Sequence, residues 1–244
     1  MVGCSCQVCT SDNPKNSRYR SSLLIQGPSG NLLIDAPPEL RLSLVREKVT
    51  RIDAVLLTHA HADHVMGLDD LRRFSELSGK SIPILAQPSV LSDVRRIFEY
   101  AFVPNEHIGG GLPRFEMVEA EAENEICGLR VMTFPVMHGK LEVLGVRIGD
   151  LAYLTDVSEI PDFSREWLTG LKTLFLDATR YMPHPSHLHY EASLELAATL
   201  GAEVTFLTHL SHDYDYEVVM RELPKGVKLS YDGLRVQVGN GEIS

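Results

Sequence analysis

Three histidines and an aspartate lie within six consecutive positions, His59-Ala60-His61-Ala62-Asp63-His64. The apolar run Ala54–Leu57 just before them predicts a buried strand, and a helix is expected after them. A strand end followed by a tight turn can direct several side chains to one point, and loops on rigid scaffolds often carry sites. Imidazole and carboxylate groups suit zinc, iron, manganese and similar ions. The chain is therefore expected to build strands that end in a metal site; a polar loop with solvated histidines is the alternative.

Short apolar runs bounded by turns predict a mixed α/β chain. Strands are expected at Ser22–Gln26, Asn31–Asp35, Ala54–Leu57, Ile82–Ala86, Phe115–Val118, Leu129–Val136, Glu142–Ile148, Leu151–Thr155, Thr173–Asp177, Val204–Leu207, Lys228–Tyr231 and Leu234–Val238. Helices are expected at Pro37–Lys48, Leu68–Ser75, Val90–Tyr100, Tyr190–Leu200 and Tyr216–Leu223. Two sheets packed face to face, with helices outside, would bury these strands. A length of 244 residues without repeats or linkers predicts a single domain, 1–244.

Further metal ligands are expected at the ends of other strands. His138, Asp156 and His209 each follow a predicted strand and precede a turn or a helix start. Any one of them alone could be a solvated polar residue. Together with the four donors of the 59–64 motif they make seven ligands, which is enough for two metal ions that share one carboxylate.

Three of the four cysteines lie in the first nine residues, as Cys4-x-Cys6-x-x-Cys9. Thiolates are typical ligands of structural zinc, which usually closes a four-coordinate site. A fourth donor is needed, and Cys127 is one candidate from the residues alone. The alternative interpretation is three reduced thiols without a metal.

The charge of the chain limits its partners. It has 23 Lys and Arg against 33 Asp and Glu, a formal net charge of −10, which is unfavourable for binding long nucleic acid. No apolar stretch approaches the ~20 residues that span a bilayer, and the N-terminus lacks the layout of a signal peptide. We therefore expect a soluble, cytoplasmic protein without membrane partners.

The 59–64 motif, followed by His138, Asp156 and His209, resembles the metallo-β-lactamase superfamily. The segments Gly3–Cys9, His184–His187 and Leu207–His212 are more specifically similar to the branch of PhnP-type cyclic phosphodiesterases, and ribonuclease Z is a more distant relative. The resemblance covers nearly the whole chain. It implies an α/β (α+β) fold, an αββα four-layer sandwich, which agrees with the two sheets expected above.

The resemblance also implies two divalent metal ions, manganese or zinc, and their ligands. The implied sets are His59, His61 and His138 for the first ion, Asp63, His64 and His209 for the second, and Asp156 bridging both. A separate structural zinc is implied in an N-terminal loop at residues 3–20, held by Cys4, Cys6, Cys9 and His212.

The implied activity is that of a phosphodiesterase that opens a small cyclic phosphate, such as a ribose cyclic phosphate or a cyclic nucleotide, through a hydroxide bridging the metals. His187 and Asp63 are the implied catalytic residues; His187 would contact the phosphate and protonate the leaving oxygen. His189 is the alternative to His187, and His184 lies nearby. Weaker candidates, with purely structural alternatives, are Lys140, Asp177 and Arg180.

Other functions remain open from the sequence. The chain could process RNA like ribonuclease Z, cleave another ester or thioester, or bind metal without catalysis. No inserted basic arm is visible, which argues against a tRNA substrate and favours a small phosphate ester. Relatives are expected to start with an additional strand, so the start Met1-Val2-Gly3 suggests a truncation or a missing edge strand. A homodimer is what the resemblance suggests.

Overall fold

The computed structural model of the chain describes residues 1–103 and 111–238, which fall into two compact units. The β1–β6 unit is Arg20–Val131, and the β7–β12 unit combines Met1–Tyr19 with the chain from Met132 onward. The single-domain expectation stays a prediction. Within the described ranges, no helix is both long and apolar enough to cross a membrane.

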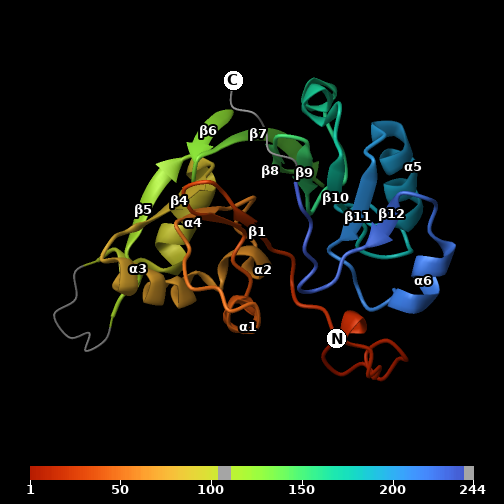
Figure 1. Ribbon diagram of the computed structural model, residues 1–244, viewed down its shortest axis with the longest axis horizontal. Helices are drawn as coiled ribbons and strands as arrows, with labels where there is room; N and C mark the ends of the chain where they lie inside the picture. Colours follow the sequence, from red (N-terminus) through yellow and green to blue (C-terminus); the bar gives the residue numbers. More distant parts are fainter. Residues whose placement is uncertain (104–110, 239–244) are drawn as a thin grey trace. The chain divides into compact units, whose positions relative to one another are not determined.

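The β1–β6 unit contains a sheet in the order β1-β2-β3-β4-β5 (Figure 1). The strands of this unit are β1 Leu23–Gln26, β2 Asn31–Ile34, β3 Ala54–Leu56, β4 Ile82–Ala86, β5 Phe115–Glu119 and β6 Glu123–Ile126. Strands β1 and β2 form the expected antiparallel hairpin, in which Gly27 N donates to Gly30 O over 2.8 Å. Strands β2 to β5 run parallel, so their carboxyl ends lie at one edge.

Helices of the same unit cover this sheet. They are α1 Leu40–Arg46, α2 Ala62–Val65, α3 Arg72–Ser78 and α4 Pro88–Ile97, with the 3₁₀ helices η2 Leu68–Leu71 and η3 Glu99–Ala101. In α4, Val90 and Val94 lie one turn apart and are buried in the same cluster as Val55 and Ile84 of the sheet. Apolar residues at this spacing share one helix face, and their burial against β-branched strand residues makes the core.

The β7–β12 unit contains a second sheet, with strands in the order β12-β11-β10-β9-β8-β7 (Figure 1). Its elements are η1 Pro14–Asn16, β7 Leu129–His138, β8 Leu141–Ile148, β9 Leu151–Leu154, η4 Asp162–Leu168, β10 Thr173–Asp177, α5 Tyr190–Leu200, β11 Val204–Thr208, α6 Tyr216–Glu222 and β12 Val227–Leu229. Strand β7 begins at the end of the β1–β6 unit. Strands β9 to β12 are parallel, and β8 is antiparallel to β9.

Strand register brings polar residues together at the carboxyl edges. In the second sheet Leu176 pairs with Leu154 and Asp177 pairs with Thr208, so the residues that follow β9, β10 and β11 emerge side by side. In the first sheet Ile34 pairs with Leu56, which brings the residues after β2 and β3 together. Carboxyl edges of parallel strands are where α/β proteins place their ligands.

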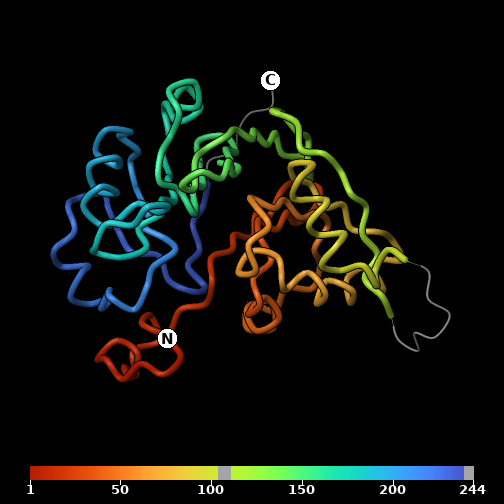
Figure 2. Tube along the Cα trace, turned by 180° about the vertical axis from the view of Figure 1, so that it is seen from behind, coloured from red at the N-terminus to blue at the C-terminus, as the bar shows by residue number. Residues whose placement is uncertain are grey.

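The N-terminal segment forms a compact coil before the chain enters β1 (Figure 2). Polar contacts attach it to the loop between β11 and α6. Asn16 Nδ2 donates to the Asp215 carboxylate over 3.0 Å, and Arg18 donates to Tyr214 O over 2.6 Å. Because the loop starts at His209, this segment also fixes residues that the sequence singled out.

Most helices and strands agree with the expectations, and the differences have local causes. The first helix begins at Leu40 rather than Pro37, since two prolines precede it and disfavour helical backbone before them. The helix expected at Leu68–Ser75 is a 3₁₀ turn followed by α3, which ends at Ser78 and is capped by Gly79 with its left-handed φ of 70°. The helix expected to reach Tyr100 ends at Ile97.

Two strand predictions are wrong. His138 is the last residue of β7 and does not lie beyond the strand. Leu234–Val238 forms no strand, so the last hairpin is absent; β12 instead pairs in parallel with β11, and the Asp232 carboxylate accepts from Tyr19 N over 2.8 Å. That contact attaches the Asp232 turn to the N-terminal segment. Strand β6, with the polar sequence Glu-Asn-Glu-Ile, was not predicted.

Candidate functional site

The histidines of the 59–64 motif lie together in the β1–β6 unit. Helix α2 begins directly after His61, and this turn brings three imidazoles close. The ring centroid of His59 lies 4.5 Å from that of His61 and 4.2 Å from that of His64. Oδ2 of Asp63 lies 3.7 Å from Nε2 of His64. His59 and His64 are buried, whereas His61 is exposed.

Asp35 is a site residue that sequence reasoning missed. It follows β2, is fully buried and has a left-handed φ of 61°. Its carboxylate accepts hydrogen bonds from Thr58 N (2.9 Å) and Thr58 Oγ1 (2.9 Å) and lies 2.8 Å from His64 Nδ1. Asp156 was marked as a candidate because it follows a predicted strand. Asp35 also follows a strand, but it was missed because the predicted strand, Asn31–Asp35, included it. Asp35 therefore orients His64.

In the β7–β12 unit, Asp156 and His209 come together as their strand-end positions suggested. Nε2 of His209 lies 3.5 Å from Oδ1 of Asp156, and Thr155 Oγ1 donates to the other carboxylate oxygen over 2.7 Å. His138 Nδ1 lies 2.6 Å from Ser186 O. These contacts hold three of the expected metal ligands in fixed orientations.

His187 also lies in this cluster. Its Nδ1 is 2.9 Å from Oδ2 of Asp177, and its ring stacks on His209 with centroids 5.0 Å apart. Asp177 is fully buried and accepts from Val157 N (3.0 Å) and Thr179 Oγ1 (2.8 Å). Asp177, His187 and His209 each offer a ligand atom within 4.8 Å of the others. The sequence marked Asp177 only as a weak candidate.

The remaining weak candidates, Arg180 and Lys140, and the alternative histidine His189 are in none of the groups of candidate metal-ligand atoms among the described residues. Arg180 donates to the carbonyl oxygens of Met182 and Pro183. His189 occupies the N-cap position of α5, and Lys140 is exposed in the turn between β7 and β8. The geometry therefore favours His187 over His189 as the histidine beside Asp156.

The orientation of the histidines fits metal ligation. In five of them Nδ1 contacts a protein oxygen, so Nε2 is the nitrogen that a metal or a substrate can use. The contacts are Thr58 Oγ1 for His59 (3.0 Å), Asp35 Oδ2 for His64 (2.8 Å), Ser186 O for His138 (2.6 Å), Asp177 Oδ2 for His187 (2.9 Å) and Thr179 Oγ1 for His209 (3.0 Å).

The distances between candidate donor atoms also fit metal ligation. Two ligand bonds of about 2.0–2.1 Å at a tetrahedral angle place their donor atoms about 3.4 Å apart. The distance from His209 Nε2 to Asp156 Oδ1 is 3.5 Å, and that from His64 Nε2 to Asp63 Oδ2 is 3.7 Å. Each unit thus holds donor pairs that a divalent ion could bind.

The N-terminal cysteines form a second cluster with His212. Sγ atoms of Cys4 and Cys6 both lie 3.4 Å from His212 Nδ1, and Cys9 completes a set of four donors within 4.8 Å of one another. The backbone N–H of Cys9, together with His212, lowers the pKa of Cys6 to about 6. A thiol that ionises easily is a good zinc ligand. Cys127, the alternative fourth donor, is not in this cluster.

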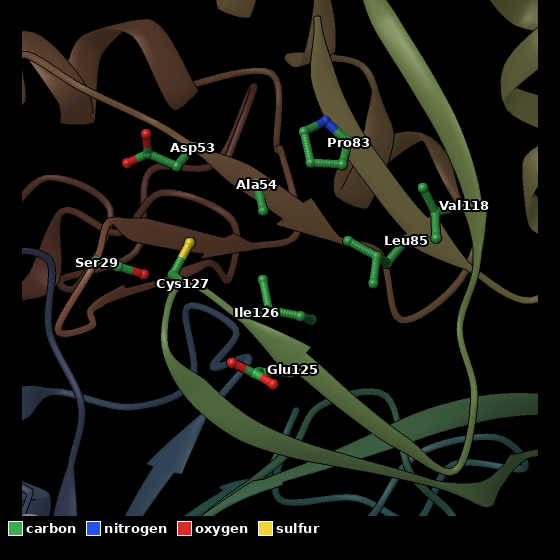
Figure 3. A pocket seen from close by; sticks show the side chains of 9 residues that line it. All are labelled: Ser29, Asp53, Ala54, Pro83, Leu85, Val118, Glu125, Ile126 and Cys127. Atoms are coloured by element: carbon green, nitrogen blue, oxygen red, sulfur yellow. The ribbon is translucent and has the colours of Figure 1, made fainter.

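A hollow of about 360 Å³ lies within the β1–β6 unit (Figure 3). Asp53, Ser29 and Cys127 lie at one end, and Leu85 and Val118 lie toward the other. None of the seven expected ligands of the metal pair lines it. Burial and the Asp53 carboxylate raise the pKa of the Cys127 thiol, which makes this cysteine a poor nucleophile or ligand. The chemistry therefore concentrates at the strand ends.

Comparison with known proteins places the chain. The β-lactamase superfamily domain matches residues 30–210. A solved diphosphatase from the PhnP family is 38% identical, with 97% of this chain and 91% of that chain covered and a TM-score of 0.90.

Two curated relatives are also similar. An octanoyltransferase of Porphyromonas gingivalis is 36% identical over 96% of this chain, but the chain spans only 48% of that protein. A ribonuclease Z of Methanopyrus kandleri is 29% identical, over 92% of this chain and 94% of its own length. The family resemblance and the fold class expected from the sequence are thus confirmed. The chain belongs to the PhnP family of the β-lactamase superfamily.

Proposed function

We propose that this protein is a metal-dependent hydrolase that opens small cyclic phosphates, as a phosphodiesterase. The observation that supports this most directly is the placement of His187. Its Nδ1 is held by the buried Asp177 at 2.9 Å, and its ring lies against His209. An imidazole fixed in this way beside metal donors suits proton transfer to a leaving oxygen.

The proposed centre uses the seven ligands that the sequence suggested. His59, His61 and His138 would hold one ion, Asp63, His64 and His209 the other, and Asp156 would bridge them. A pair of divalent ions, manganese or zinc, supplies positive charge for the phosphate and lowers the pKa of water. The zinc proposed at Cys4, Cys6, Cys9 and His212 has a structural role.

The protein groups have separable tasks in this proposal. Asp177 accepts from Nδ1 of His187, which keeps Nε2 available to carry a proton to the leaving oxygen. Thr179 Oγ1 donates to Asp177 and contacts Nδ1 of His209, so one hydroxyl couples the orientation of both histidines. In the β1–β6 unit, the Thr58 hydroxyl donates to Asp35 and contacts Nδ1 of His59. Asp35 in turn contacts Nδ1 of His64, so the orientations of these two histidines are coupled as well.

A small substrate fits the charge of the chain. With a net charge of −10, the surface does not attract a long polyanion, and the positive charge for one phosphate would come from the metals. A tRNA substrate, as in the ribonuclease Z relatives, is therefore the weaker alternative. A cytoplasmic location and a homodimer are further proposals.

A second candidate is the hydrolysis of a diphosphate. The relative that is 38% identical is described as a diphosphatase. Both reactions break a P–O bond and build negative charge on phosphate oxygens, so the same metal and histidine groups would serve. A thioester, which the sequence left open as an alternative substrate, is a third compound to test.

Phosphorus NMR of the zinc- or manganese-loaded protein tests the proposal. The substrates are ribose 1,2-cyclic phosphate, a 2′,3′-cyclic nucleotide and a nucleoside diphosphate, with the reaction stopped by a chelator before the spectrum is recorded. The Asp156→Ala variant serves as the blank.

Ring opening by wild type alone supports the phosphodiesterase, and release of phosphate from the diphosphate alone supports the second candidate. If fully metal-loaded protein cleaves none of them, the proposal is wrong, and the thioester, a lactone and RNA are tested next.

A further inference from the structure

Hydrogen bonds within the loop between β10 and α5 stabilise its conformation. Arg180 and His189 form an isolated bridge at its neck, where Tyr190 N donates to Arg180 O over 2.9 Å. The Arg180 guanidinium donates to the carbonyl oxygens of Met182 (3.1 Å) and Pro183 (2.9 Å). These contacts fix the backbone that leads into His184.

His184 is held in one tautomer by its own loop. Ser186 N lies 3.3 Å and Ser186 Oγ lies 3.2 Å from His184 Nδ1. A backbone N–H can only donate, so Nδ1 accepts, and the proton of the neutral imidazole is assigned to Nε2. His184 therefore presents an N–H donor on the side of the ring away from Ser186.

His184 lies next to the candidate metal ligands but is not one of them. Its ring centroid lies 4.9 Å from that of His187, and the His187 ring lies 4.5 Å from that of His138. No group of candidate ligand atoms in the described residues includes His184. A histidine placed next to a metal-binding cluster, but outside it, is positioned to contact what the cluster binds.

The surroundings of His184 disfavour the charged form of its imidazole. Partial burial lowers its pKa, and His187 and Arg180 lower it further. A neutral imidazole keeps Nδ1 as an acceptor for Ser186, and with it the Nε2–H donor.

We propose that His184 is a substrate-binding residue that donates its Nε2–H to a phosphate oxygen of the substrate. This inference rests on the proposed function, because it assigns a phosphate as the ligand of the same site. His187 would act on the leaving oxygen, and His184 would hold a non-leaving oxygen. The two histidines of the segment His184–His187 then have different tasks.

Three substitutions separate this role from a purely structural one. His184→Ala removes both ring nitrogens. His184→Asn places an oxygen where Nδ1 was, so the contact with Ser186 survives without the distal donor. His184→Gln reaches the position of Nε2 with an amide N–H. Met182→Ala, in the same loop with a side chain that is 69% exposed, is the control.

The measurements are the affinity for inorganic phosphate, by calorimetry on zinc-loaded protein, and kcat/KM for the best substrate found above. His184→Ala and His184→Asn are expected to lose about tenfold to a hundredfold in both, the loss typical of a hydrogen bond to a charged group. His184→Gln should recover most of this loss, with metal content unchanged in all variants.

Recovery by His184→Asn to the level of His184→Gln would show that the residue only shapes the loop, and would overturn the inference. Wild-type affinity in His184→Ala would overturn it too. The phosphate titration does not require turnover. If wild type binds phosphate but hydrolyses no phosphate compound, the proposed function fails while the role of His184 is still decided by the titration.

Discussion

His187 Nδ1 lies 2.9 Å from Oδ2 of Asp177, a carboxylate with no exposed surface. The same carboxylate accepts from a backbone N–H of Val157 and from the Thr179 hydroxyl. A buried carboxylate needs such partners, because an unpaired one is costly away from water. Three donors therefore fix Asp177, and Asp177 fixes the ring that the proposed reaction uses.

Asp177→Asn should lower kcat about tenfold to a hundredfold, the loss typical when a partner that orients a histidine at a metal site is removed. The amide cannot accept equally from Val157, Thr179 and His187, so the His187 ring loses its fixed tautomer. Steady-state kinetics on the substrate identified by NMR checks this. Asp162→Asn, at a fully exposed side chain, is the control; equal kcat in both variants would contradict the assignment.

Asp35→Asn should weaken metal binding by the β1–β6 unit. An amide N–H at this position favours a proton on Nε2 of His64, the nitrogen proposed to ligate. Affinity is expected to fall about tenfold to a hundredfold, measured as metal retained during titration with a chelator. Asp93→Asn, which removes only an exposed contact with Arg96, should retain metal as wild type does. Unchanged retention in Asp35→Asn would rule out this role.

Cys6→Ser should remove one zinc per chain and lower the melting temperature, because the ion links the N-terminal coil to His212. The Cys127→Ser substitution is the matched control, since Cys127 is not among the clustered donors. Zinc content by mass spectrometry of the intact native protein distinguishes the two variants. Equal zinc content in both would show that the thiols are not ligands.

Asp215 provides a test of pH dependence. The backbone N–H of Val218 and the side chain of Asn16 lower the pKa of this carboxyl. A lowered folded-state pKa means that the contribution to stability is complete above the ordinary carboxyl pKa and is lost as the pH falls through the lowered one. Asp215→Ala should therefore cost about 1 kcal/mol at neutral pH, as for other N-caps.

The difference in unfolding free energy between wild type and Asp215→Ala should shrink in acid, as the wild-type carboxyl becomes protonated. Chemical denaturation at a series of pH values measures it. A difference that stays constant down to about pH 2 would contradict the electrostatic part of this account.

Local patterns predicted much of the fold. Ile82–Ala86, Thr173–Asp177 and Tyr190–Leu200 have the bounds that the sequence suggested, because each is an apolar segment closed by turn or cap residues. Strand β6 escaped detection because its polar sequence carries no burial signal. The expected strand Leu234–Val238 has an alternating pattern, yet its turn is attached to Tyr19, which is distant in the sequence.

The candidate site likewise contains residues that the sequence predicted and residues that only the structure revealed. The 59–64 motif is a local signal, dense enough to recognise by itself. Asp35 orients His64 across 29 positions, and Thr179 orients His209 across 30, so neither contact can be seen until strand register is known. Residues that ligate could be predicted from type and spacing, whereas residues that orient them required the structure.

Asp35, Asp156 and His209 each follow a strand with a left-handed backbone, at φ of 61°, 53° and 57°. Such a conformation costs a non-glycine residue about 1 kcal/mol or more, and glycine adopts it freely. In metal-free protein, glycine at Asp156 or His209 should therefore raise the melting temperature. A laboratory selection for heat resistance alone is expected to replace these side chains, so every round of such a selection on this protein must include a test of activity.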